Sequence, residues 1–113
     1  MNPSHIHKRA DEVLRFSCRK KNYLSVPEWD GEGIPPVETF RAIRANEALD
    51  MAGMYAAKAK SFSNESEGWS NPEWAEEQAE YMERDLAEYS RLKNASPEEI
   101  WHLEAEWYGI AEA

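Results

Sequence analysis

The sequence predicts an all-α protein: a small four-helix bundle with one ordered Gly/Pro-rich loop between its first two helices. Apolar residues recur at helical spacing through four segments, and no stretch alternates apolar and polar residues as a β-strand would. At 113 residues the chain is expected to form one helical domain, residues 1–113. The expected helices cover residues 4–22, 36–60, 72–93 and 97–111, and the loop covers 23–35.

The first two helices differ in their apolar patterns. The helix over 4–22 carries one stripe that includes Ile6 and Val13. The helix over 36–60 is rich in alanine and has no narrow stripe, which is typical of a central helix contacted from several directions. Its only weak point is Gly53, which costs about 1 kcal/mol relative to alanine.

The last two helices have recognisable starts. Asn71 stands before a proline and is expected to cap the helix over 72–93. Ser96 also precedes a proline, and with Glu99 three residues later it forms a capping box for the helix over 97–111. Both helices are amphipathic, so each must turn one side toward the core.

Composition and charge restrict the functional classes. The chain has one cysteine, no apolar run long enough to span a bilayer and no signal-peptide pattern, so a cytoplasmic protein without membrane contact is expected. Its net charge is -9. Residues 1–21 hold six Lys or Arg against two acidic residues, whereas the rest of the chain is strongly acidic. The basic segment 1–21 and the acidic remainder of the chain can bind each other, within one copy or between copies, or they can contact different partners.

The acidic side of the third helix is the first candidate site. Its glutamates are spaced along the helix at about the linear charge density of a DNA strand, so they can imitate a phosphate backbone toward a basic protein. The alternative is a solvated face that maintains solubility, with Arg84 pairing with Glu80 one turn away. The candidate partner-binding residues are Glu73, Glu76, Glu77, Glu80, Glu83 and Glu88.

A basic and aromatic cluster in the first helix is the second candidate site. Such a cluster is typical of contacts with anions, here a nucleotide-like ligand, while the acidic body makes direct duplex binding unexpected. In the alternative interpretation Phe16 is covered by Tyr23 and Leu24 as the chain turns back. The candidate anion-binding residues are Arg15, Phe16, Arg19, Lys20 and Lys21.

Three charged residues fall on otherwise apolar helix faces: Arg44, Asp85 and Glu104. An unpaired charge in the core is costly, so Arg44 or Arg15 is expected to pair with one of these carboxylates inside the bundle. The alternative is a polar pocket lined by aromatic side chains, which could hold a small ligand.

The sequence contains no motif that indicates catalysis or metal binding. His7, Asp11 and Cys18 share a side of the first helix, but three mixed ligands on one helix make a poor zinc site. The zincin, phosphate-loop, CxxC and GxSxG patterns are absent. We therefore expect no metal, no cofactor and no enzymatic activity.

The stretch EWDGEGIPPV, residues 28–37, is the one part that does not have helical character. Its glycines and prolines predict turns and an extended approach to the second helix, with Trp29, Val26 and Ile34 closing one end of the bundle. Over these ten residues the chain resembles a WDGEGLPPV-like stretch of small uncharacterised bacteriophage proteins. The resemblance implies phage ancestry, and hence a host cytoplasm, but no activity. Small acidic helical proteins without motifs are similar to phage inhibitors of host defence, including anti-CRISPR proteins.

These observations favour a non-enzymatic binding protein that blocks a basic host protein involved in defence or nucleic-acid handling through its acidic helix face. The competing hypothesis is an oligomeric protein that sequesters an anionic nucleotide through its basic first helix. A third is an adaptor or structural protein. Homo-oligomerisation is expected in each case, because the tryptophans and the wide apolar face of the fourth helix exceed what three small neighbours cover.

Overall fold

The computed structural model describes residues 3–64 and 71–110, and this part of the chain is all-α, without a strand. The class predicted from the sequence is therefore confirmed. None of the described helices is long and apolar enough to cross a membrane. The helices are α1 (Pro3–Ser17), the short 3-10 helix η1 (Lys20–Asn22), α2 (Val37–Phe62), α3 (Pro72–Asn94) and α4 (Pro97–Trp107).

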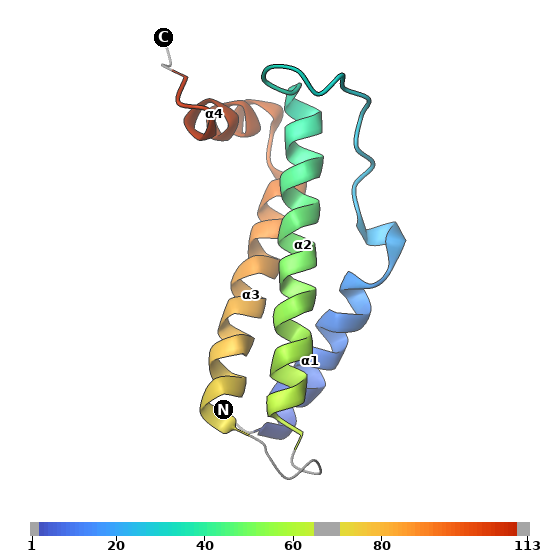
Figure 1. Cartoon of the computed structure of the whole chain (residues 1–113), viewed down its shortest axis with the longest axis vertical. Coiled ribbons are helices and arrows are strands. Elements are labelled where there is room, and N and C mark those ends of the chain that lie inside the picture. The colour runs from blue at the N-terminus through green and yellow to red at the C-terminus, as the bar shows by residue number, and fades with distance from the viewer. Residues whose placement is uncertain (1–2, 65–70, 111–113) are drawn as a thin grey trace.

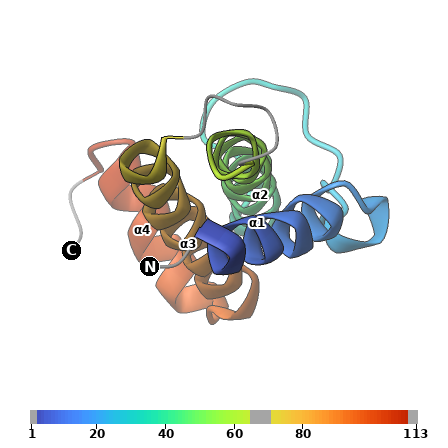
Figure 2. The ribbon, with the colours of Figure 1, turned by 90° about the horizontal axis from the view of Figure 1, so that it is seen from below.

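Helices α2 and α3 form a long antiparallel pair, and the other two helices lie on different sides of it. Helix α1 packs along one side of the pair, and α4 lies across the opposite side at one end (Figure 1). The end-on view in Figure 2 shows the same separation. Helix α2 contacts each of the other three helices, as its alanine-rich sequence predicts. The arrangement differs from a bundle of four aligned helices because α4 does not run alongside α2 and α3.

The core between α1, α2 and α3 consists mainly of small side chains from α2 and α3. Alanines allow helix backbones to approach closely, and the larger aliphatic residues of α1 fill the space that remains. A second cluster, around Phe40, Leu49, Tyr89 and Ile100, joins α2 and α3 to α4. The buried residues of the first cluster include Ile6, Ala10, Val13, Ala52, Ala56, Ala59, Ala75, Ala79 and Met82.

Helix α1 ends at Ser17, five residues earlier than the sequence predicts. The Asn22 side chain donates a hydrogen bond to the carbonyl of Phe16 (2.8 Å), and the Tyr89 hydroxyl donates one to the carbonyl of Asn22. These bonds hold the chain in a 3-10 turn beside α3. A local bond from Asn22 and a bond from Tyr89, 67 residues away along the chain, thus act together at the end of this helix.

The predicted starts of α3 and α4 are confirmed in atomic detail. The Asn71 side chain accepts a hydrogen bond from the Trp74 N–H (3.2 Å), and the Ser96 hydroxyl accepts one from the Glu99 N–H (3.1 Å). Helix α4 stops at Trp107, earlier than predicted, because Gly109 adopts a φ of +68° and terminates the helix. The predicted extension to residue 111 ends outside the described residues.

An arginine of α2 caps the C-terminal end of α3. The guanidinium of Arg41 is buried, donates to the carbonyl of Leu92 (2.7 Å) and pairs with Glu38 (2.8 Å). The last carbonyls of a helix lack partners within that helix, and its C-terminus carries partial negative charge. Arg41 thus supplies a C-terminal cap for α3 from a neighbouring helix.

The connection between α1 and α2 runs along the outside of the molecule. The side chain of Asn46 bonds both the N–H and the carbonyl of Leu24, each at 2.9 Å, which fixes the start of this segment on α2. Farther along, Val26, Trp29 and Ile34 are between 36% and 50% exposed, so the prediction that they close the end of a bundle is wrong. Figure 1 shows the last part of this connection passing over the N-terminal end of α2, with α4 to one side.

Candidate functional site

The glutamates of the acidic candidate site lie along the solvent side of α3. Glu73, Glu76, Glu77, Glu80 and Glu83 are exposed, and the Glu88 side chain is 43% exposed. The opposite side of α3 is buried through Ala75, Ala79, Met82, Tyr89 and Leu92. The helix therefore separates its acidic and apolar residues as the 3.6-residue period requires.

Glu83 and Glu88 form ion pairs that reduce the negative charge at these two positions. Glu83 accepts two hydrogen bonds from Arg9 of α1, one of them at 3.1 Å, so the basic first helix neutralises this position. Glu88 pairs with Arg91 on its own helix (2.6 Å). Glu73, Glu76, Glu77 and Glu80 are exposed in the N-terminal half of α3, and Glu73 in its first turn also complements the helix dipole.

Arg84 pairs with a different carboxylate from the one predicted. It bonds Asp85 (3.3 Å) and its guanidinium stacks over the ring of Tyr81, 5.0 Å from the centroid. The expected bond to Glu80 is therefore wrong, because the aromatic face of Tyr81 draws the guanidinium to the other side of the helix. The Tyr81 hydroxyl in turn donates to Glu77 (3.3 Å), which raises the pKa of that phenol.

The residues of the basic candidate site do not all lie together on the surface. Arg19, Lys20 and Lys21 are exposed at η1, but Arg15 pairs with Asp11 (3.0 Å). Phe16 is half-buried and packs edge-on against Tyr89, with ring centroids 6.0 Å apart. Tyr23 and Leu24 pack in the same cluster, which supports the alternative interpretation of Phe16. The ring of Phe16 therefore packs against α3 and does not form a free surface beside the three exposed cations.

The charges predicted to meet inside the bundle do not pair with one another. Arg44 pairs with Glu47 on its own helix and stacks over the ring of Trp107 at 3.9 Å, and Asp85 pairs with Arg84. Glu104 is 4% exposed, and its Oε2 has no hydrogen-bond partner among the described residues. Burial raises the pKa of this carboxyl group.

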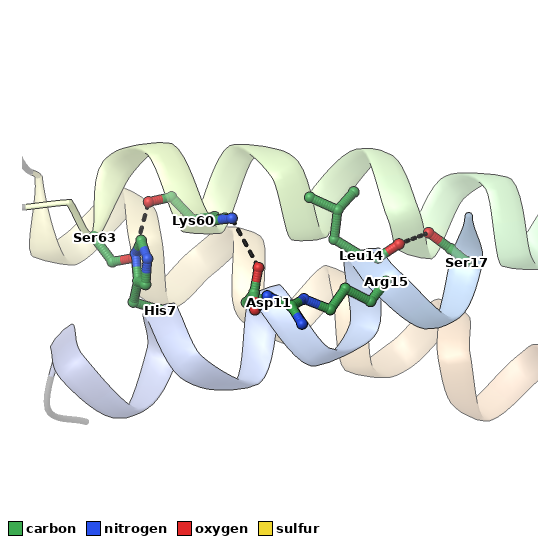
Figure 3. Close-up of polar contacts among 7 residues, drawn as sticks. All are labelled: His7, Asp11, Leu14, Arg15, Ser17, Lys60 and Ser63. Atoms are coloured by element: carbon green, nitrogen blue, oxygen red, sulfur yellow. Dashed lines mark hydrogen bonds and ion pairs between the residues drawn. The ribbon is translucent and has the colours of Figure 1, made fainter. Parts of the chain in front are cut away.

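His7 and Asp11 of α1 form polar contacts with the C-terminal end of α2. Lys60 donates to Asp11 (2.8 Å), and His7 Nδ1 lies 3.3 Å from the Ser63 hydroxyl, as Figure 3 shows. The bond from Lys60 lowers the pKa of Asp11. In the described ranges, 3–64 and 71–110, no three His, Cys, Asp or Glu side chains come together as metal ligands would.

A groove of about 600 Å³ lies between α2, α3 and α4. Arg44, Asp85 and Glu88 line it together with apolar side chains, including Met51 and Trp107. Two of the three charges that the sequence places on apolar faces thus lie in one groove, while Glu104 is buried elsewhere. The position of α4 was not predictable, so the sequence did not reveal this groove.

Comparisons of the chain with family models, with curated proteins and with solved structures gave no match.

Proposed function

We propose that the protein is a non-enzymatic acidic binding protein that engages a basic protein surface through the outer side of α3. The observation that carries this proposal is the exposure of Glu73, Glu76, Glu77 and Glu80 along one solvent-facing helix side. The net charge of -9 supports it, because a negative field accelerates the encounter with a basic partner.

The partner class follows from the spacing of the carboxylates. Successive glutamates on this side are a few ångströms apart along the helix axis, comparable to the phosphates of a nucleic-acid strand. A protein that handles nucleic acid in a host cell therefore fits this surface, and binding there would block its nucleic-acid site. The similarity to phage inhibitors of host defence favours the same class.

The test is a charge reversal with a matched control. Glu76→Lys, Glu77→Lys and Glu80→Lys together should abolish the salt-sensitive capture of bacterial proteins by the immobilised chain, with far-UV helicity unchanged. The control reverses Glu28, Asp30 and Glu32, three exposed acidic residues of the α1–α2 connection, and so changes the net charge equally. Capture that falls equally in both variants would show a net-charge effect and would refute a specific α3 surface.

The alternative function, sequestration of an anionic nucleotide, is supported by the three exposed cations Arg19, Lys20 and Lys21 at η1. A nucleotide at 100 times its Kd should add about 2.7 kcal/mol to the free energy of unfolding. Thermal unfolding with ATP, GTP and cyclic dinucleotides measures this stabilisation, and alanine at all three positions should remove it. An unchanged melting temperature with every nucleotide argues against this function.

A further inference from the structure

We propose that the groove between α2, α3 and α4 binds a small aliphatic amine or guanidine that carries two positive charges. The groove lies where α4 crosses one end of the α2–α3 pair, so side chains of three helices meet there (Figure 1). The four outer glutamates of α3 that carry the proposed function do not line it. The ligand site is therefore independent of that function.

The size and the apolar lining of the groove suit a small molecule. Its volume is about 600 Å³, within the range of roughly 300–1,000 Å³ that is typical of ligand sites. Phe40, Ala48 and Leu92 line it and belong to the buried cluster that joins α2 and α3 to α4. Met51 and Trp107 also line it and are 40% and 59% exposed. An aliphatic stem can therefore pack against apolar surface that the core already holds in place.

The charged side chains that line the groove are mainly acidic. They comprise four carboxylates and two guanidinium groups, which gives the lining a net charge of -2. Both guanidinium groups pair with carboxylates of their own helices, in the pairs Arg44–Glu47 and Arg91–Glu88. The carboxylates that remain are Asp85 of α3 and Glu106 of α4. Such a lining repels anions and attracts cations.

Asp85 and Glu106 both keep the capacity to bind a cation. Arg84 bonds Asp85 at 3.3 and 3.4 Å, which is long for a charged pair, and Arg84 itself does not line the groove. The Asp85 side chain is only 16% exposed, and a carboxylate shielded from water attracts a cation more strongly than an exposed one. Glu106 is exposed, and it forms no ion pair within the described ranges 3–64 and 71–110.

A guanidinium already stacks on an aromatic ring in this groove. The Cζ atom of Arg44 lies 3.9 Å from the centroid of the Trp107 ring, and Glu47 is the carboxylate partner of the same guanidinium. Tryptophan is the side chain whose ring attracts cations most strongly. Because Trp107 remains 59% exposed, a second cationic group can contact its ring beside Arg44. This intramolecular contact indicates the class of ligand: a cationic group that contacts an aromatic ring and pairs with a carboxylate.

An organic cation fits these residues better than a metal ion. In the part of the chain that the structure describes, no three His, Cys, Asp or Glu side chains come together as metal ligands would. Hard divalent cations bind oxygen atoms and gain nothing from indole or aliphatic side chains. Asp85 and Glu106 belong to different helices, so we assign one positive group of the ligand to each of them and the aliphatic stem to the apolar lining.

Isothermal titration calorimetry of the full chain with putrescine, cadaverine and agmatine tests this site. At least one of these dications should bind with 1:1 stoichiometry, and 1,4-butanediol, the uncharged counterpart of putrescine, should not bind. Asp85→Asn and Glu106→Gln should each raise the Kd about tenfold, because each loses a charge-assisted hydrogen bond. Trp107→Leu should raise it about fivefold through loss of the cation–π contact.

A matched pair of double variants separates the groove from the overall negative charge. Asp85→Asn with Glu106→Gln removes two carboxylates of the groove, whereas Glu76→Gln with Glu80→Gln removes two exposed carboxylates outside it. Both proteins have the same net charge, and far-UV circular dichroism should show equal helicity. The Kd should rise only in the groove variant.

Three results would overturn the proposed site. The first is that none of the three dications binds up to millimolar concentration. The second is an equal loss of affinity in the two double variants, which would show attraction to the acidic surface as a whole. The third is displacement of the bound dication by an equal concentration of Mg²⁺. Lysate capture by the groove variant should stay unchanged, because the proposed function requires only the outer glutamates of α3.

Discussion

The two sides of the α2–α3 pair are built from residues of different size. On the side of α1, Ala52 and Ala56 provide a flat surface on which Ile6 and Val13 are completely buried. On the opposite side of the pair, Met51, Tyr55 and Trp74 project from the same two helices and remain partly exposed. Small residues let a helix backbone approach closely, whereas large ones form a ridge that must interdigitate with another surface.

The charged residues differ in the same way. On the α1 side, ion pairs join separate helices, as in Arg9–Glu83 and Lys60–Asp11. On the opposite side of the pair, Arg44 and Arg91 pair within their own helices, with Glu47 and Glu88. Exposed pairs of either kind contribute at most about 1 kcal/mol. The ion pairs on the first side therefore join α1 to α2 and α3, whereas those on the second side connect residues of the same helix.

The largest expected effect contrasts these two sides directly. Ile6→Ala should lower the free energy of unfolding by about 3 kcal/mol, because it leaves a cavity between α1 and α2 that the alanines cannot fill. Met51→Ala should change the stability of the isolated monomer by less than about 0.5 kcal/mol, since Met51 is 40% exposed. Urea unfolding at low protein concentration measures both variants. Equal losses of unfolding free energy in the two variants would show that the two sides of the pair do not differ in how tightly they are packed.

A smaller effect tests how closely α1 approaches α2. A Cβ at Gly53 would clash with the Ser17 hydroxyl oxygen, so Gly53→Ala should destabilise by about 1 kcal/mol although alanine favours helix. In a Ser17→Gly background the clash disappears, and the same change should become neutral or stabilising. A double-mutant cycle by chemical denaturation measures this coupling; additive effects would mean that the helices are farther apart.

The smallest effect concerns Glu104, a buried residue of α4. Burial raises its pKa, so the folded state favours the protonated form, and stability falls as the pH rises through the raised pKa. Glu104→Gln should therefore be more stable than the wild type by about 1 kcal/mol at pH 7.5 and should lose this advantage near pH 4. Thermal unfolding between these pH values checks the trend. A constant difference would indicate that Glu104 is solvated.

Features encoded within a few residues were predictable from the sequence. The starts of α3 and α4 follow from Asn71 and Ser96, each with its following proline, and alanine spacing identified α2 as the central helix. Helical periodicity also placed the glutamates of α3 opposite its buried side. Capping and periodicity depend on residues that are close along the chain, so the sequence alone is enough to predict helix starts and the buried side of a helix.

Features that depend on distant contacts were not predictable. The end of α1 depends on Tyr89, and the pairing of Arg44 depends on where α4 places Trp107. The orientation of α4 also decided the groove between α2, α3 and α4. Two-residue links such as that between α3 and α4 allow many crossing angles, and only the assembled packing selects one of them.

The Arg41 cap on α3 restricts how the lengths of α2 and α3 can vary among related chains. Because this guanidinium binds the final carbonyls of α3 from the second turn of α2, the two helices must keep a common register. One inserted residue in either helix would shift the cap by about 1.5 Å and rotate it by about 100°. Insertions and deletions should therefore accumulate in the connections, while the lengths of α2 and α3 change together.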